Sequence, residues 1–443
     1  MPARWCPAAG LISARATLVR NHGDASHGRG HSTPRRKRAA TLVIRGLELV
    51  AGGPFARATF TNFVFMSSLS CFILLPLYVQ SLGGTEAQIG LVQGVYSAAG
   101  ILCQPLIGHW LDRIGRRFFM TLGVSLLIVS SAAFLVTHSL VLLAALRAVQ
   151  GLGFSAFFVA NYMHVIDLVP VERRGWALGI YGVSGFLGTA LAPVAGEIIV
   201  RRLGFPALFV LSVQLGLVAA WLVIRMRGIL PPRMGEAPGL ESLRAGLAEV
   251  LRLHMALAFF FGLGTGAMFT FLPTFGEALG VHSVSLFYTA YAIAAVGVRV
   301  AGGNLIDTRG RRATIVPSMF VLTASTGLLT VLALFVRPQM TMPVVPFLFL
   351  TGLLAGAAHG FLYPALAALL MDVTPEARRG GVVGIFSAVF LVGNALGSMV
   401  FGYIAHGLGY FVMWTTLTVL LAAGFGLSFR LRVGHAVRTP HAV

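Results

Sequence analysis

Long apolar runs without a charged side chain recur along this chain and limit what it can fold into. Residues 60–79 and 118–136 are two such runs of about 20 residues. An α-helix of that length rises about 30 Å, the thickness of the hydrocarbon core of a bilayer. Only 11% of the residues are charged, against about 25% in soluble domains. These features predict a membrane protein with several helical spans.

Twelve spans are expected where apolar runs lie between charged, glycine-rich or proline-rich boundaries. They are residues 60–80, 88–110, 118–137, 140–166, 175–200, 205–225, 254–278, 284–306, 313–335, 344–371, 380–404 and 409–430. The first six are expected to form one bundle over residues 59–225, and the last six a second bundle over residues 254–431. The predicted fold class is an all-α membrane protein with twelve transmembrane helices in two six-helix bundles.

Three segments lie outside these spans. Residues 226–253 form a polar linker with leucines at helical spacing, which predicts a short helix on the membrane face. Residues 1–58 are basic, and we expect a disordered cytoplasmic tail or a misplaced start codon, with a targeting or membrane-surface tail as the alternative. Residues 432–443 are expected to form a cytoplasmic tail.

Basic residues are distributed unequally between the two sets of loops. Fifteen arginines lie in one set: Arg113, Arg116, Arg117, Arg173, Arg174, Arg225, Arg227, Arg233, Arg244, Arg252, Arg309, Arg311, Arg312, Arg378 and Arg379. The other set contains only Arg201, Arg202 and Arg337. Cytoplasmic loops of membrane proteins carry an excess of Lys and Arg. This asymmetry predicts that the first set, the linker and both termini are cytoplasmic.

The two halves of the chain repeat one another. Residues 108–117 (GHWLDRIGRR) align with residues 303–312 (GNLIDTRGRR), 195 positions later. A second pair of segments, around Asp167 and Asp372, aligns at an offset of 205. Shared hydrophobicity alone does not produce matching charges. The repeat therefore predicts two parallel bundles related by an axis along the membrane normal.

These motifs resemble those of a known family. Residues 108–117 match the loop 2–3 signature of the major facilitator superfamily, and residues 303–312 are similar to its second copy. The sequence RAVQGLG at residues 147–153 resembles the helix 4 motif of the family, and residues 75–85 resemble its twelve-helix bacterial drug-efflux members. The resemblance spans residues 58–432. It implies a secondary active transporter that works by alternating access.

By this resemblance, the repeated loops gate the cytoplasmic side. Asp112 is expected to face the start of helix 11, and Arg116 to pair with Asp167. In the second copy, Asp307 is expected to face helix 5, and Arg311 to lie near Asp372. The expected gating residues are Gly108, Asp112, Gly115, Arg116, Arg117, Asp167, Arg173, Gly303, Asp307, Gly310, Arg311, Asp372 and Arg378. The alternative is that these residues only form turns and set the topology.

Charged residues inside the expected spans are rare and mark candidate sites for coupling or substrate binding. Arg147, which shares the helix 4 motif with Gln150, falls at the same depth as Glu197 on the next helix. We expect Arg147 and Glu197 to pair or to share a proton-linked site, with a solvated Glu197 as the alternative. Arg299 is either a contact for an anionic substrate group or a cap between helices.

Helix 5 and the expected cavity helices supply further candidates. Residues 188–196, with Gly188, Pro193 and Gly196, resemble the exporter signature of the family but depart from it at Ala192 and after Gly196. Close helix packing explains the small residues equally well. By resemblance, helices 1, 4, 7 and 10 line the cavity, and the candidate lining residues are Asn62, Asn161, Tyr162, His359 and Tyr363.

The favoured function is proton-coupled export of an amphiphilic or drug-like molecule by a monomer in the bacterial inner membrane. An importer or uniporter of a small organic acid is the alternative, and a membrane-embedded enzyme is a distant one. The sequence contains no clustered nucleophile, and Cys6, Cys71 and Cys103 lack the spacing of metal ligands. We therefore expect no enzymatic activity, no cofactor or metal, and no nucleic-acid partner.

Overall fold

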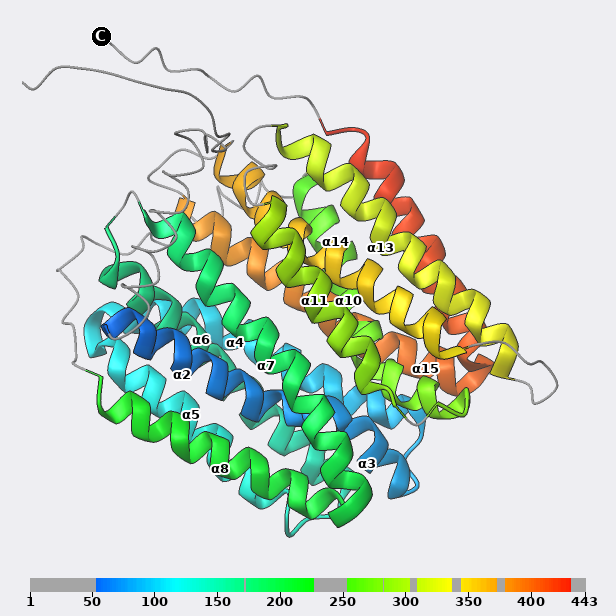
Figure 1. Cartoon of the computed structure of the whole chain (residues 1–443), viewed down its shortest axis with the longest axis horizontal. Coiled ribbons are helices and arrows are strands. Elements are labelled where there is room, and N and C mark those ends of the chain that lie inside the picture. Colours follow the sequence, from blue (N-terminus) through cyan, green and yellow to red (C-terminus); the bar gives the residue numbers. More distant parts are fainter. Residues whose placement is uncertain are drawn as a thin grey trace, which may run out of the picture. The chain divides into compact units, whose positions relative to one another are not determined.

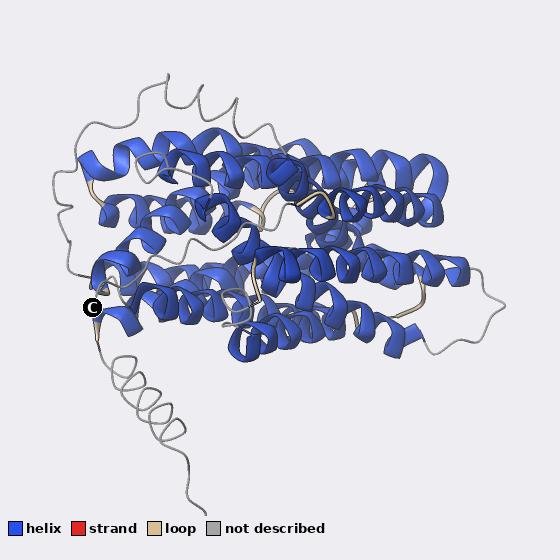
Figure 2. Cartoon of the chain, turned by 90° about the horizontal axis from the view of Figure 1, so that it is seen from above, coloured by secondary structure: helices blue, strands red, loops and turns tan. Residues whose placement is uncertain are grey.

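The structure, a computed structural model, describes residues 53–170, 173–226, 253–281, 283–302, 309–336, 344–372 and 379–431. These residues belong to one compact unit over residues 50–443, and all their regular elements are helices (Figures 1 and 2). The elements are α2 (Pro54–Ser70), η1 (Cys71–Leu74), α3 (Leu75–Ser81), α4 (Glu86–Ile114), α5 (Arg116–Ala133), α6 (Leu140–Leu168), α7 (Arg174–Leu203), α8 (Phe205–Ile224), α10 (Leu253–Ala278), α11 (Ser285–Gly302), α13 (Arg311–Ala333), η3 (Leu334–Val336), α14 (Val344–Asp372) and α15 (Arg379–Ser428).

Nine of the described helices are long and apolar enough to cross a membrane. Elements α2, η1 and α3 run together as one of them, Pro54–Ser81, and α15 counts as one although its backbone leaves helical geometry at Gly409. Dividing α15 there, and adding α4 and the shorter apolar helix α11, gives twelve helical segments in the described part of the chain. They follow the expected spans in order, so the all-helical, membrane-spanning fold class is confirmed.

Glycines in the left-handed region form the repeated turns. Gly115 (φ 99°) separates α4 from α5, and Gly310 (φ 87°) precedes α13 at the equivalent place in the second half. A side chain at such a φ is strained, so glycine permits the sharp turn. Gly409 (φ 81°) turns the chain within α15 in the same way. The repeat seen in the sequence is therefore also a repeat of backbone conformation.

Helices of each half pack mainly on one another. In the first half, α2 packs on α7 and α8, α4 packs on α6, and α5 packs on α6 and α8. In the second half, α10 packs on α15, α11 on α14, and α13 on both α14 and α15. In Figure 1 the first group fills the lower left and the second the upper right. A buried apolar cluster, from Phe55 to Met226, belongs entirely to the first group.

The halves meet mainly through two helix pairs, α4 with α15 and α7 with α11, and α10 also packs on η1, α3 and α4 of the first half. The α4–α15 contact is close because Gly90 and Gly402 face each other, and a Cβ at Gly402 would lie 2.7 Å from the backbone oxygen of Glu86. Small residues allow such close approach of membrane helices. Ser97 Oγ also donates to Asn394 Oδ1 across this contact, at 2.7 Å.

Several expectations fall on parts of the chain that are not described. The linker helix within residues 226–253, the tail over residues 1–58, except for its last six residues, and the tail over residues 432–443 all lie outside the described residues. The first span, by contrast, begins at Pro54, six residues before the expected start. Proline is favourable at the first helical position, because its missing N–H would have no partner there.

Candidate functional site

The first copy of the repeated loop forms the expected ion pair. Arg116, at the start of α5, pairs with Asp167, near the end of α6. Arg116 is buried, and its Nη1 also donates to the backbone oxygen of Met163 at 3.3 Å. The next residue, Arg117, donates from Nη2 to the backbone oxygen of Ile224 at 2.6 Å. The loop thus ties the start of α5 to the ends of both α6 and α8.

The second copy makes the equivalent contacts. Arg311 Nε lies 2.9 Å from Asp372 Oδ2, at the end of α14. Arg312 Nη2 donates to the backbone oxygen of Phe429 at 3.1 Å. In both copies, therefore, the second arginine binds a carbonyl at the C-terminal end of the last helix of its half. Arginine is favourable there because these carbonyls lack helical partners. The repeated arginine is visible in the sequence, but this role is not.

We call the end of the bundle that carries these four arginines the basic end, and the other end the opposite end. Arg173, which precedes α7 at the basic end, is exposed and has no side-chain partner among the described residues. The side chain of Asp112, together with Gly303, Asp307 and Arg378, lies outside the described residues. Gly108 lies within α4. The helix contacts expected of the two aspartates stay predictions.

Arg147 of α6 is buried and surrounded by neutral groups. Its Nη1 donates to Gln150 Oε1 at 2.8 Å and its Nη2 to Gln93 Oε1 of α4 at 2.5 Å. The guanidinium carbon lies 4.3 Å from the centroid of the Tyr96 ring and 5.8 Å from that of Phe72. A cation over an aromatic face is attracted by the ring quadrupole. Among the described residues, no carboxylate pairs with this cation.

Glu197 does not pair with Arg147, so that prediction is wrong. Its carboxylate accepts the backbone N–H of Val284 at 3.1 Å and that of Ser285 at 3.2 Å, and it pairs with Arg201 at 3.0 Å. The two charges do lie at similar depths, but Glu197 faces the N-terminus of α11 rather than α6. The first N–H groups of a helix lack partners and carry partial positive charge, so they attract a carboxylate.

This contact joins α7 of the first half to α11 of the second. Beside it, a cleft of about 590 Å³ lies between the halves at the opposite end. Its lining residues are Leu74, Leu77, Gln80, Ser81, Glu197, Val200, Arg201, Phe205, Glu277, Val281 and Val284. The cleft is therefore bordered by a carboxylate that also bridges the halves.

Arg299 of α11 lies where both halves meet. Its guanidinium carbon is 4.7 Å from the centroid of the Phe186 ring on α7, and its Nε donates to the backbone oxygen of Gly360 on α14 at 3.3 Å. Arg299 therefore bridges three helices, and it is only partly buried. Contact with an anionic substrate group stays a prediction.

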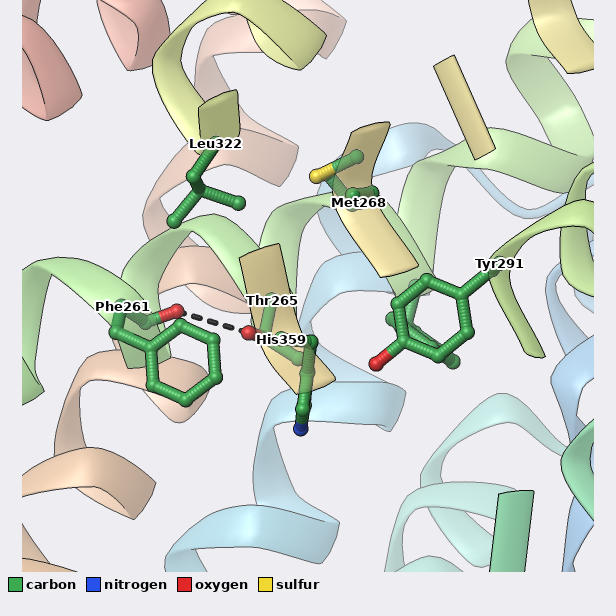
Figure 3. A pocket seen from close by; sticks show the side chains of 8 residues that line it. Phe261, Thr265, Met268, Tyr291, Leu322 and His359 are labelled. Carbon is green, nitrogen blue, oxygen red and sulfur yellow. Dashed lines mark hydrogen bonds between the residues drawn. The ribbon is translucent and has the colours of Figure 1, made fainter. Parts of the chain in front are cut away.

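His359 packs among aromatic rings rather than lining an open cavity. Its ring makes edge contacts with Phe261 at 4.7 Å, Tyr291 at 5.6 Å and Phe186 at 5.8 Å between centroids. The void beside it measures about 10 Å³, the size of one water molecule (Figure 3). Thr265, which also borders this void, donates its hydroxyl to the backbone of Phe261 at 2.8 Å (Figure 3).

The two candidate asparagines are buried and join helices within the first half. Asn62 of α2 donates to Ser184 Oγ at 2.8 Å, and Asn161 of α6 donates to the backbone oxygen of Ala58 at 3.2 Å and to the Tyr181 hydroxyl at 3.3 Å. Neither side-chain oxygen accepts a hydrogen bond from the residues that the structure describes. Both residues therefore hold α2, α6 and α7 together in this conformation.

Tyr162 and Tyr363, the two aromatic candidates, lie on different halves. Tyr162 of α6 packs its ring against Phe158 and Tyr181, and Tyr363 of α14 packs against Phe386. Tyr363 lies one turn after Gly360, whose carbonyl accepts a hydrogen bond from Arg299 Nε. The structure thus brings Arg299 and Tyr363 to the same stretch of α14, which the sequence could not show.

The glycines of the helix 5 motif make close helix contacts. A Cβ at Gly188 would lie 2.9 Å from the backbone nitrogen of Ser67 on α2, and one at Gly196 would lie 2.8 Å from Leu208 on α8. Pro193 lies inside α7, which continues past it. These contacts are sufficient to explain the small residues by packing.

Comparison with known proteins identifies the family. The profile described as Major Facilitator Superfamily matches residues 58–345 and 257–442, which together cover most of the chain. The chain belongs to the major facilitator superfamily. The predicted family is confirmed, and this member is a multi-pass membrane transporter.

Two bacterial members of the superfamily match this chain over most of their length. The staphylopine export protein of Staphylococcus aureus is 22% identical over 390 residues, which cover 85% of this chain and 95% of that protein. The multi-drug resistance efflux pump PmrA of Streptococcus pneumoniae is 25% identical over 387 residues, which cover 84% of this chain and 94% of that protein.

Solved structures of superfamily members share the fold. The human organic anion transporter MFSD10 aligns with a TM-score of 0.63 at 18% identity, covering 85% of this chain and all of that one. The nucleoside transporter NupG aligns with a TM-score of 0.68 at 16% identity, and the alignment covers 86% of this chain and all of that one. At such low identity, these likenesses concern the fold alone.

Proposed function

We propose that this chain exports a small amphiphilic molecule across a bacterial inner membrane by alternating access, driven by protons. The names of two relatives, an export protein and an efflux pump, support the direction. The excess of arginine at the basic end supports a cytoplasmic basic end with both termini on that side.

The observation that carries the proposal is the contact between the halves at Glu197. Its carboxylate, on α7, holds two backbone N–H groups at the start of α11. When the halves separate at this end, both hydrogen bonds break together. At the basic end, the pairs Arg116–Asp167 and Arg311–Asp372 fasten neighbouring helices within each half. Each half can therefore move as a body while contacts between the halves open and close.

Proton coupling follows from the chemistry of Glu197. An ionised carboxylate accepts hydrogen bonds from the α11 N-terminus and from Arg201, whereas a protonated one loses most of this attraction. Protonation therefore favours opening of the opposite end. Inside a span, and away from the gating loops, Glu197 is the carboxylate best placed for this role among the described residues.

The test is the direction of transport. Bacteria lacking their own efflux pumps would express the full chain, or Arg147→Ala at matched levels, and grow on a panel of cationic, neutral and anionic amphiphilic toxins. Export predicts tolerance of higher concentrations of at least one toxin, with lower cellular accumulation, only with the unaltered chain. Higher accumulation of the toxins in cells with the unaltered chain would indicate import and contradict the proposal.

A further inference from the structure

Arg299 has cationic nitrogens that donate no hydrogen bond within the described part of the chain. Over the ranges that the structure describes, only its Nε donates a hydrogen bond, to Gly360, and its guanidinium also lies against the Phe186 ring. Among the described residues, no carboxylate contacts it. A charge within the hydrocarbon thickness is costly, so it needs a partner or a polar cavity.

Arg147 is the useful comparison, because it is also a buried cation without a carboxylate. Both of its terminal nitrogens are occupied by glutamine oxygens, and it is only 6% exposed. Arg299 is less buried, and its terminal nitrogens make no hydrogen bond with the described residues. Of the two, Arg299 is the one that can receive a ligand without first losing protein partners.

The surroundings of Arg299 fit an anion attached to an apolar group. The guanidinium lies over the Phe186 ring, and Tyr363 lies one turn after Gly360, which accepts from Arg299 Nε. The rings of Phe186 and Tyr291 are in contact, at 6.1 Å between centroids. These groups come from α7, α11 and α14, so both halves of the transporter contribute.

Gly182 of α7 makes room for the guanidinium. A Cβ at this position would overlap the terminal nitrogen Nη1 of Arg299 and meet no other group within 4 Å besides the Arg299 guanidinium carbon. Gly179, one turn earlier on the same helix, would meet nothing within 4 Å. The space that Arg299 occupies therefore depends on a single glycine in the other half.

We propose that Arg299 binds the anionic group of an amphiphilic organic acid, whose apolar part packs on Phe186 and Tyr291. This substrate class rests on the proposed transport function and narrows it. A guanidinium matches the planar, two-oxygen face of carboxylates and sulfonates, and the charged hydrogen bonds favour an anion over a neutral analogue.

The experiment compares two probes that differ only in charge. Naphthalene-1-sulfonate and naphthalene-1-sulfonamide are measured by equilibrium binding to the full chain in lipid nanodiscs, with protein-free nanodiscs subtracted. The unaltered protein is expected to bind the sulfonate about tenfold more tightly. Arg299→Gln abolishes this preference, and Arg299→Lys retains part of it.

Two glycine variants distinguish a specific loss of the Arg299 site from a general loss of folded structure. Gly182→Ala displaces only the flexible end of Arg299, so it weakens sulfonate binding and leaves sulfonamide binding unchanged. Gly179→Ala behaves as the unaltered protein in both measurements. An unaltered protein that binds the two probes equally, or binds neither, overturns the site. A sulfonate preference that survives Arg299→Gln also overturns it.

Counterflow of both probes in proteoliposomes tests transport separately. Counterflow without a charge preference contradicts the anion site and leaves the transport function standing. Arg299-dependent binding without any counterflow supports the site and contradicts transport of this class of molecule.

Discussion

At the scale of single residues, Arg147 and Glu197 do not form the pair expected from the sequence, and each of them contacts other groups. Glu197 holds the α11 N-terminus, Arg147 holds two glutamines, and Arg299 lies on a ring. A carboxylate at a helix N-terminus gains from the unpartnered N–H groups and from the helix dipole, with magnitudes of about 0.3–2 kcal/mol. Such a contact is strong enough to bias a conformational equilibrium and weak enough to break during each cycle.

Glu197→Gln is expected to uncouple transport from the proton gradient. The amide mimics the protonated carboxylic acid, so the opposite end opens without proton binding. In proteoliposomes, the transport rate of the variant should be nearly the same with and without an inside-to-outside pH gradient, whereas the rate of the unaltered chain should depend on it.

Glu277→Gln is the matched control, because this carboxylate borders the same cleft without a hydrogen bond to α11. It should retain the dependence on the gradient. Full gradient dependence of Glu197→Gln would exclude Glu197 as the coupling residue.

At the scale of helices, the halves meet through surfaces of small residues. Gly90 of α4 and Gly402 of α15 lie back to back, so the two backbones touch where side chains would normally separate them. Because backbone meets backbone at this point, and the side-chain hydrogen bond from Ser97 to Asn394 is neutral, such an interface can separate and re-form over short distances. In contrast, the Arg–Asp pairs and the carbonyl contacts of Arg117 and Arg312 fasten helices within each half.

Gly402→Val is expected to prevent closure of the α4–α15 contact and to slow transport by about tenfold or more, because the side chain would meet backbone atoms that cannot move aside. Gly407→Val lies five residues later on the same helix and would meet nothing within 4 Å. It should transport at the normal rate. The measurement is the transport rate of each variant at equal amounts of folded protein. Equal rates would show that transport does not need a close α4–α15 contact.

At the scale of the whole molecule, the distribution of arginine and the repeated loops predict one orientation in the membrane. Loops at the basic end would lie in the cytoplasm and the Glu197 end outside. Import and export can both operate in this orientation, because the gradients of the substrate and of the coupling ion set the direction of the cycle.

A membrane-impermeant maleimide tests the orientation in intact cells. In a chain with Cys6, Cys71 and Cys103 replaced by serine, a cysteine at Ser139, which precedes α6 at the opposite end, should be labelled. A cysteine at Arg225, which follows α8 at the basic end, should be labelled only after the cells are opened. The reverse pattern would invert the proposed topology.

Much of the fold could be predicted from the chain alone. Three local properties of the sequence determine it: the length of the apolar runs, the turn glycines Gly115 and Gly310, and the duplicated charges. Each of them shapes the structure within a few residues of its own position. The pairs Arg116–Asp167 and Arg311–Asp372 could be expected because the family resemblance supplied the partners.

Tertiary structure alone decided what the buried charges contact. A membrane helix that is hydrophobic on all sides gives no sequence signal for which side faces which neighbour. The sequence therefore indicated that Arg147 and Glu197 share a depth, but not that they face different helices. A difference of a few tens of degrees in helix rotation selects the partner. For the same reason, only the packed structure brought Arg299 to Gly182 and Phe186 of the other half.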